Sequence, residues 1–343
     1  MARGRQPAHA KEAQKLQDAL AFISVAGTKK VRPTDTHCML RENWALMTDG
    51  QLYAGYPIEE NINCCPQFEQ LKAAVKKCGK TLSVTVLDSG RLSMKGDKLR
   101  ALIPCFSFED MPDIDPDPMI APASDELKKA FEVCGVLADE NGASVLEASL
   151  MLENCVCTST DRKAMLQYWH GVGLPPVPLI VPKIFTAAVA KQKEELVGIG
   201  YSPDHSITFH FKNGAWIKTL LYADKWPVEN VYNILNRQAN PSAVPEDFIK
   251  GVEAISDFSE LGDIFLVEDG IQSHKSAEQG AQYEVKGIIA GKHIRAKNIL
   301  QLKDVIQTWD YQSYDNQVMF FGADGKARGT FTTCFPEIEE ESQ

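Results

Sequence analysis

Lysine and arginine recur on the polar faces of the predicted amphipathic helices, where their chemistry is electrostatic. On the helix predicted over 66–79, Lys72 and Lys76 lie four residues apart, opposite an apolar stripe that contains Phe68 and Leu71. A single surface lysine is ordinary. Basic residues on equivalent helices of a chain with a formal net charge of −10, however, favour one basic surface that faces a polyanion. The candidate residues are Lys11, Lys15, Lys72, Lys76, Lys77, Lys80, Lys128, Lys183, Lys191, Arg295, Lys297 and Lys303.

The residue types that support catalysis do not form a recognisable constellation. The segment AVKKCGKT at 74–81 differs from a phosphate-binding P-loop by one residue, because Ala74 stands where the first glycine is required. A P-loop opens a helix, whereas this segment ends one, so Gly79 is better interpreted as a helix stop. The seven histidines are far apart in the sequence and no carboxylate cluster accompanies them. We therefore predict no catalytic residue and no cofactor.

The nine cysteines are an odd number, and none forms a Cys-x-x-Cys pair. Cys155 and Cys157 would share one face of a strand, but no second pair accompanies them, so buried structural thiols are predicted and no metal site. Reduced thiols are typical of a cytosolic compartment. The first residues carry basic charge without an apolar core after it, which is not a secretory signal.

A strand–turn–strand unit that closes on a proline occurs three times in the chain. The copies are 82–104, 205–227 and 316–336, with turns built on Gly90, Asn213-Gly214 and Asp324-Gly325. A second hairpin-like stretch with an acidic turn precedes each copy, at Asp49, Asp161 and Asp269. Turn residues between two alternating apolar runs are a strong hairpin signal, and repetition at a long period indicates tandem domains.

Two helices are predicted in each repeat, and together the repeats predict an α+β architecture. The first helices span 11–26, 124–139 and 245–260, and the second helices span 66–79, 182–195 and 295–310. Proline-rich segments at 106–123 and 236–245 are interpreted as linkers. The predicted domains are 1–105, 120–235 and 245–336, followed by an acidic tail at 337–343. Each domain should pack two helices on antiparallel sheets.

This organisation resembles the bacterial-type DNA sliding clamp, the β-subunit of the replicative polymerase. The local matches are MTDGQLYAG (47–55), STDRKAML (159–166), RALIP (100–104) and KARGTF (326–331). The resemblance implies a non-enzymatic ring of two head-to-tail protomers, whose helices line a pore around duplex DNA of any sequence. The basic residues named above would face the phosphates. It also implies a DNA polymerase, a clamp loader and a second copy of the chain as partners. No membrane association is predicted, because no apolar run approaches the ~20 residues that span a bilayer.

The resemblance further implies a pocket for a partner peptide between the second and third domains. The matching positions are Thr160, Met165, Pro227, Val231, Tyr232, Phe335 and Pro336. The chain departs from the family where TDRK replaces an Asp-Gly turn and where the C-terminus continues as EIEEESQ. A divergent clamp would fit, such as one encoded by a phage and acting in the host cytoplasm. The alternative is a non-catalytic repeat scaffold that binds proteins and does not encircle DNA.

Overall fold

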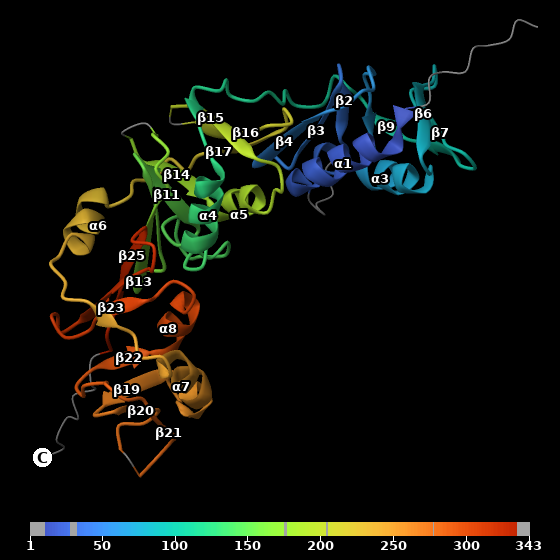
Figure 1. Cartoon of the computed structure of the whole chain (residues 1–343). Helices are drawn as coiled ribbons and strands as arrows, with labels where there is room; N and C mark the ends of the chain where they lie inside the picture. The colour runs from blue at the N-terminus through green and yellow to red at the C-terminus, as the bar shows by residue number, and fades with distance from the viewer. Residues whose placement is uncertain (1–10, 28–32, 175–176, 204, 277, 335–343) are drawn as a thin grey trace, which may run out of the picture. The chain divides into compact units, whose positions relative to one another are not determined.

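The computed structural model describes residues 11–27, 33–174, 177–203, 205–276 and 278–334. The chain divides into two compact units, one comprising Met1–Asp125 with Ala188–Tyr222 and the other Glu126–Ala187 with Ala223–Gln343. Both units consist of antiparallel sheets with helices against them (Figure 1). Within the described ranges, no helix has the length and apolar character needed to cross a membrane.

The first unit contains a seven-stranded sheet of order β10-β15-β16-β17-β4-β3-β2, a four-stranded sheet of order β1-β6-β7-β8 and the pair β5-β9. Its strands are β1 (Lys11–Glu12), β2 (Met39–Arg41), β3 (Trp44–Thr48), β4 (Leu52–Pro57), β5 (Cys65–Pro66), β6 (Thr81–Val86), β7 (Leu92–Lys95), β8 (Arg100–Ile103), β9 (Cys105–Phe106), β10 (Ala121–Pro122), β15 (Leu196–Ser202), β16 (Ser206–Phe211) and β17 (Trp216–Leu220). Its helices are α1 (Ala13–Ile23), the 3₁₀ turn η1 (Ser24–Ala26), α2 (Pro33–Thr36) and α3 (Phe68–Lys77).

The second unit contains an eight-stranded sheet of order β14-β11-β12-β13-β25-β24-β23-β18 and a four-stranded sheet of order β21-β20-β19-β22. Its strands are β11 (Ser149–Glu153), β12 (Val156–Thr160), β13 (Ala164–Trp169), β14 (Leu179–Pro182), β18 (Ser242–Ala243), β19 (Asp263–Val267), β20 (Gly270–Gln272), β21 (Gln282–Glu284), β22 (His293–Arg295), β23 (Thr308–Asp310), β24 (Gln317–Phe321) and β25 (Ala327–Thr332). Its helices are α4 (Asp125–Cys134), α5 (Lys183–Ala190), α6 (Val228–Leu235), α7 (Phe248–Ile255), the 3₁₀ turn η2 (Ser256–Phe258) and α8 (Ala296–Leu302).

Each of the two large sheets joins strands from two sequence repeats. β17 pairs antiparallel with β4, with Thr219 opposite Leu52, and β25 pairs antiparallel with β13, with Phe331 opposite Ala164. In both joints the last strand of one repeat pairs with the strand that follows the Thr-Asp turn of the repeat before it. β4 and β13 are also the third strands of the meanders β2-β3-β4 and β11-β12-β13, and β21 has the same place in the meander β19-β20-β21. The acidic turn at Asp269, predicted as the counterpart of Asp49 and Asp161, instead lies one hairpin earlier, between β19 and β20. Among the described residues, β8, the last strand of its repeat, and β21 end their sheets without such a partner.

Paired helices lie against the sheets in the first and third repeats. α1 lies beside α3 and against β3 and β4, and α7 lies beside α8 and against β20 and β21. The predicted apolar stripe of α3 is confirmed, because Phe68, Leu71, Val75 and Cys78 are at most 4% exposed. All six predicted helices are present, although each is shorter than predicted.

Two of the helix predictions need correction. The helix predicted over 295–310 ends at Leu302, and Trp309 instead lies in β23, where it is buried and its backbone pairs with β18 and β24. Lys11, predicted at the start of a helix, lies in β1 opposite Leu82. Helix α6 was not predicted, because its short apolar pattern stands between two proline-bearing segments.

The predicted equivalence of the three repeated turns is wrong for the first copy. Gly90, with φ 74°, lies in the turn between β6 and β7, whereas Gly214 and Gly325 lie in turns that precede the last strand of their repeats. The first-repeat counterpart is the turn between β7 and β8, where the Gly96 amide donates to the Leu99 carbonyl at 2.9 Å. Alternating apolar residues continue through both hairpins, so the pattern did not distinguish them.

The segment 106–123 is not a free linker, because a buried carboxylate attaches it to the sheet. Asp117 is 4% exposed and accepts hydrogen bonds from Ser202, Ser206 and Thr208 at 2.7 to 3.0 Å. The Lys218 ammonium lies 3.2 Å from the same carboxylate. Burial would raise the pKa of Asp117, but these donors outweigh it and hold the pKa below its usual value.

We expect Asp117→Asn to lower the free energy of unfolding by about 3 kcal/mol at neutral pH, since Lys218, whose side chain is only 17% exposed, would be left without its counter-charge. Because folding depresses the pKa of Asp117, its stabilisation is present above the unfolded pKa and is lost as pH falls. The difference between wild type and variant should therefore shrink below about pH 4. Urea unfolding at several pH values measures this. Asp115→Asn, in the same segment but 69% exposed, is the control and should change little.

Candidate nucleic-acid interface and partner site

Helix α3 presents the clearest basic surface of the first unit. The Gln67 side chain caps its N-terminus by accepting the Gln70 amide at 2.7 Å. Lys72, Lys76 and Lys77 are exposed, and the described residues provide no ion-pair partner for any of the three. The Lys72 ammonium lies 5.6 Å from the centre of the Phe68 ring. The helix macrodipole also favours lysine in the last turn. These ammonium groups are available to an anion.

The other candidates of the first unit differ in their surroundings. Lys15 on α1 is exposed and forms an ion pair with Glu59. Lys80 follows α3 and is exposed, as is Lys191, which lies just beyond the end of α5. Lys15 therefore already has a carboxylate partner, which a phosphate would have to replace. Exposed pairs of this kind contribute little stability, so the exchange would cost little.

Two residues of the second unit that were predicted to contact DNA, Lys128 and Lys183, are instead buried or bonded within the protein. The Lys128 side chain is only 8% exposed, contrary to the prediction of an open basic face. The Lys183 ammonium donates to the carbonyls of Gly135, at 2.8 Å, and Ala138, which follow the end of α4. Lysine is well suited to this position, because it satisfies carbonyl groups that the helix end leaves unpaired.

The basic residues of the third repeat lie around α8. Lys297 is exposed, and the Lys303 ammonium lies 2.8 Å from the Glu253 carboxylate, which raises the pKa of the lysine. Arg295 precedes the helix and its Nε lies 3.6 Å from Asp263 Oδ1. The third repeat therefore offers fewer uncompensated charges than α3.

The turn between β12 and β13 positions Thr160 and Met165. Thr160 Oγ1 donates to the Ala164 carbonyl at 2.7 Å and accepts the Arg162 amide at 2.9 Å, while Asp161 accepts two further turn amides. Thr160 is 8% exposed, and Met165 is half-buried with its backbone paired to Thr330. The turn geometry, rather than an open pocket, accounts for Thr160.

Helix α6 carries two of the predicted pocket residues, Val231 and Tyr232, follows a third, Pro227, and packs beside β25. Pro227 is exposed at its N-terminus and Tyr232 is half-buried, with its hydroxyl donating to Glu153 Oε2 at 3.0 Å. Val231 is 1% exposed, so it belongs to the core beneath the helix rather than to an accessible groove. Phe335 and Pro336 lie outside the described residues.

The sequence prediction missed the residues that fasten α6 to the sheet. The Arg328 guanidinium donates to Gln167 Oε1 through Nε at 2.9 Å and Nη2 at 2.8 Å, and to Asn236 Oδ1 through Nη1 at 3.1 Å. Arg328 lies on β25 and Gln167 on β13, so one side chain connects both strands of the joint to the end of the helix. An arginine within a strand of small and apolar residues was the available signal.

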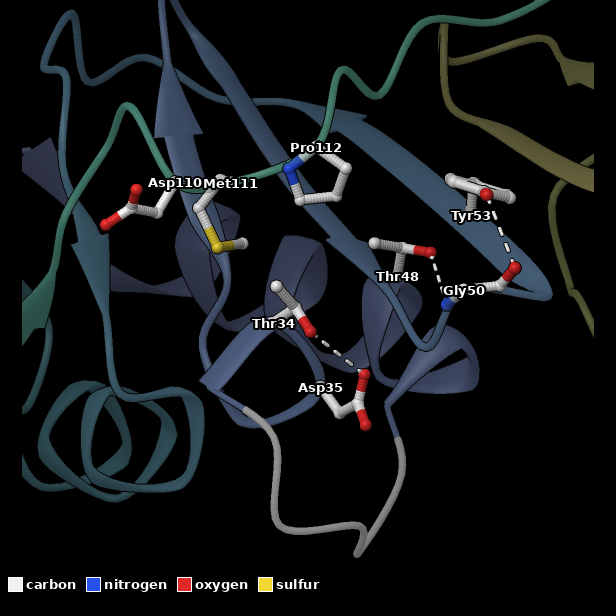
Figure 2. Close-up of a pocket in the computed structure, with 8 residues that line it drawn as sticks. All are labelled: Thr34, Asp35, Thr48, Gly50, Tyr53, Asp110, Met111 and Pro112. Atoms are coloured by element: carbon white, nitrogen blue, oxygen red, sulfur yellow. Dashed lines mark hydrogen bonds between the residues drawn. The ribbon is translucent and has the colours of Figure 1, made fainter.

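A pocket of about 340 Å³ lies in the first unit beside the turn between β3 and β4 (Figure 2). Its lining consists of Thr34, Asp35, Thr48, Gly50, Tyr53, Asp110, Met111 and Pro112. Thr48 Oγ1 accepts the Gly50 amide at 2.9 Å, the same contact that Thr160 makes with Arg162. None of the residues predicted from the sequence lines this pocket.

No protein-family model and no curated protein matches the chain. Solved structures do match it across 95% of its length. They include the DNA polymerase III subunit beta of Pseudomonas aeruginosa (13% identity, 99% of that chain, TM-score 0.79) and the DNA polymerase sliding clamps of Bacillus subtilis (12%, 98%, 0.79) and Caulobacter crescentus (14%, 99%, 0.78).

The chain has the fold of a bacterial DNA sliding clamp. The predicted α+β clamp architecture is confirmed by this likeness and by the two joined sheets. At 12–14% identity the likeness establishes the fold alone. The three domain boundaries and the individual site residues stay predictions. The clamp fold is consistent with strand joints that repeat along the chain, each using the strand after a Thr-Asp turn.

The Thr160 turn provides a test of this repeat equivalence. Arg162 has φ 69° where Gly50 has φ 87° in the first repeat, and left-handed backbone disfavours any residue with a Cβ. We expect Arg162→Gly to raise the free energy of unfolding by about 0.5–1 kcal/mol, and Gly50→Arg to lower it by about 1–2 kcal/mol. Thermal unfolding of both variants measures this. A loss of stability in Arg162→Gly would mean that its 3.0 Å ion pair with Glu147 outweighs the strain.

Proposed function

We propose that this protein is a DNA sliding clamp. Two copies close into a ring around duplex DNA and hold a DNA polymerase there, without catalysis of their own. The observation that carries the proposal is the likeness to solved clamps over 95% of the chain. A clamp loader is a further expected partner, since a closed ring needs to be opened to admit closed circular DNA.

The sheet edges support ring closure between two copies. Within the chain, the last strand of a repeat pairs with the third meander strand of the repeat before it: β17 pairs with β4, and β25 pairs with β13. By the same rule, β8 of one copy should pair antiparallel with β21 of the other, which would leave neither edge open. Leu102, on β8, is 47% exposed in the single chain. Arg100 on β8 and Glu284 on β21 are both exposed and carry opposite charges.

The basic surface of α3 supports contact with the DNA backbone. Lysine ammonium groups attract phosphates without reading bases, and weak contacts screened by salt allow movement along the duplex. The carboxylate-paired Lys15 in the first unit, and Lys297 and the carboxylate-paired Lys303 in the second unit, would make further contacts of the same kind. The net charge of −10 would discourage DNA from binding elsewhere on the protein.

The surface around α6 is the proposed partner site. Pro227, Met165 and Tyr232 are exposed or half-buried in the second unit. Apolar and aromatic side chains of this kind supply most of the binding energy when a peptide desolvates them. Val231 and Thr160 would support these residues from beneath rather than contact the peptide. Phe335 and Pro336 stay predictions for the same site.

The ring proposal predicts a dimer of twice 38.0 kDa in sedimentation equilibrium. Leu102→Asp should yield a monomer, because it places a charge in the edge contact between copies. Val177→Asp introduces the same change at a residue that is 49% exposed in a loop, and should remain dimeric. A wild-type monomer at micromolar concentration, or a trimer, would contradict the pairing of β8 with β21.

The DNA contact predicts that Lys72→Glu, Lys76→Glu and Lys77→Glu together weaken duplex binding without lowering the melting temperature. Each lost phosphate contact should reduce the slope of log affinity against log salt by roughly 0.9. The control, Lys98→Glu with Lys225→Glu and Lys286→Glu, makes the same charge change at exposed positions outside the helices and should bind more strongly than the α3 variant.

Retention on DNA separates a clamp from a protein-binding scaffold. A ring loaded on nicked circular plasmid should co-elute with it in gel filtration and be lost once the plasmid is linearised. A scaffold would behave alike on both DNAs. Equal retention on circular and linear plasmid would therefore contradict encirclement, even if the dimer is confirmed.

A further inference from the structure

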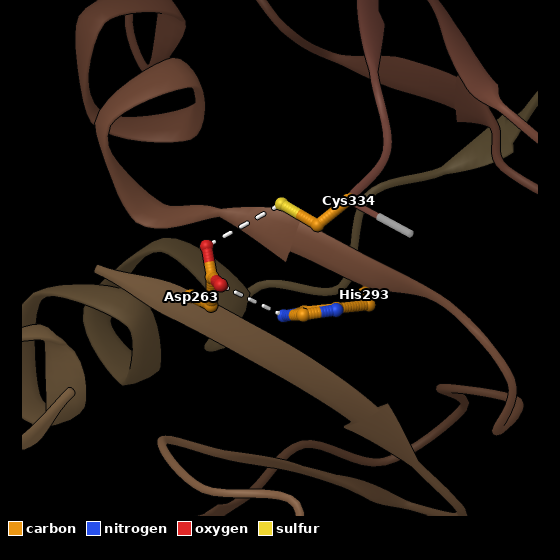
Figure 3. Close-up of side chains that lie close together, drawn as sticks. All are labelled: Asp263, His293 and Cys334. Atoms are coloured by element: carbon orange, nitrogen blue, oxygen red, sulfur yellow. Dashed lines mark hydrogen bonds and ion pairs between the residues drawn. The ribbon is translucent and has the colours of Figure 1, made fainter. Parts of the chain in front are cut away.

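Three side chains with metal-ligating atoms meet in the third repeat. Asp263 begins β19, His293 begins β22 and Cys334 follows β25 (Figure 3). Their ligand atoms all lie within 4.8 Å of one another. Asp263 Oδ2 lies 3.1 Å from His293 Nε2, and Asp263 Oδ1 lies 3.3 Å from Cys334 Sγ.

The backbone brings these residues to one place. Asp263 stands opposite Arg295 and Phe265 opposite His293 in the β19–β22 ladder, so Asp263 and His293 project from the same face of the sheet. The Cys334 amide donates to the His293 carbonyl at 2.7 Å, which holds the segment after β25 beside β22. The cluster therefore connects the four-stranded sheet to the segment that leaves the eight-stranded sheet.

The two ring nitrogens of His293 lack a well-aligned hydrogen bond among the described residues. Both ring nitrogens are buried, and neither has an aligned hydrogen bond within the described part of the chain, although Nε2 lies close to Asp263. The ring stacks on Phe265 with centroids 4.1 Å apart and planes 16° apart, which fixes its orientation. A buried polar group without a hydrogen bond calls for an explanation, and a bound ion is one.

We propose that Asp263, His293 and Cys334 bind one divalent transition-metal ion, with zinc as the ion that best suits the donors. Imidazole and thiolate together select zinc over magnesium or calcium, and a thiolate with a carboxylate balances the double charge. Zinc–ligand bonds of about 2.0–2.3 Å in a tetrahedron place ligand atoms roughly 3.3–3.7 Å apart. The Asp263–His293 and Asp263–Cys334 separations of 3.1 and 3.3 Å are a few tenths of an ångström shorter, so small side-chain movements would admit the ion. Water supplies the fourth ligand.

Among the described residues, Arg295 is a positive charge beside the cluster that opposes a cation. Its Nε lies 3.6 Å from Asp263 Oδ1, and its side chain is 45% exposed. The metal and the guanidinium compete for the same carboxylate oxygen, and the flexible, partly exposed arginine can move into solvent when the metal binds. Removing this positive charge should therefore strengthen metal binding, an effect in the opposite direction to the loss of a ligand.

The test uses the full-length, tag-free protein, treated with a chelator and then titrated with Zn²⁺ and with Co²⁺. We expect one zinc per chain, and a thiolate-to-cobalt charge-transfer absorption. Cys334→Ser should abolish that absorption. It should also weaken zinc binding by at least about 100-fold. Mutating a residue that only hydrogen-bonds to a metal ligand already weakens metal affinity by about 10- to 100-fold, and losing a ligand should cost more. Arg295→Gln should bind zinc more tightly than wild type. Wild-type protein that binds no zinc at micromolar concentration would overturn the site.

Cys155→Ser is the matched control, because Cys155 is another half-buried free thiol and belongs to a different part of the second unit. It should retain both the cobalt absorption and the zinc affinity. An absorption that survives Cys334→Ser, or is lost equally in Cys155→Ser, would assign the metal elsewhere and overturn the proposal. Cys334 and Arg295 are both at least partly exposed, so we expect Cys334→Ser and Arg295→Gln to fold. The test therefore does not need His293→Ala or Asp263→Asn, which could unfold the protein.

Discussion

The backbone of a strand edge must find partners, and the rest of this structure follows from how that requirement is met. An unpaired edge presents a row of amides and carbonyls that other chains can bind. Here the repeats use their edges on each other, through the β4–β17 and β13–β25 ladders. The side chains that look most specific, such as Arg328, reinforce these ladders rather than create them.

Joined sheets explain why buried polar groups occur where the sequence suggests loops. A segment that crosses a sheet must either stay solvated or satisfy its polar groups against the strands. Asp117 does the second, through three hydroxyl donors and Lys218. The proline-rich segment around it is therefore held on the sheet, although its composition is typical of an extended linker.

The features that the sequence predicted are those encoded locally. The stripe of Phe68 and Leu71, the hairpins and the six helices follow from periodicity and turn residues within a few positions of one another. The surroundings of Lys128 and Lys183 do not follow from periodicity. A lysine on a helix has the same local sequence pattern whether it faces solvent or the end of another helix. The spacing of the basic residues therefore does not distinguish the exposed lysines of α3 from the buried Lys128 of α4 or from Lys183 of α5, which bonds to carbonyls.

The candidate metal site could not be predicted for a related reason. Asp263, His293 and Cys334 come from three separate strands or strand ends, and no spacing rule connects them. The same is true of the Arg328 and Gln167 contact, which exists only because β13 and β25 are neighbours. A single sequence contains no covariation from which such contacts between distant strands can be inferred.

The division into two compact units has a consequence for how the chain acquires its structure. The middle repeat contributes β11–β14 to one unit and β15–β17 to the other, so its two halves belong to different cooperative bodies. A protein built from three repeats should then fold as two units, and contacts between distant segments should make each of them slow to nucleate. Fragments cut at the repeat boundaries would expose β13 or β4 as open edges prone to aggregation. The ladders between repeats therefore limit how such a chain can evolve. Adding or losing a single repeat would leave a strand edge unpaired, even though the sequence itself is repetitive.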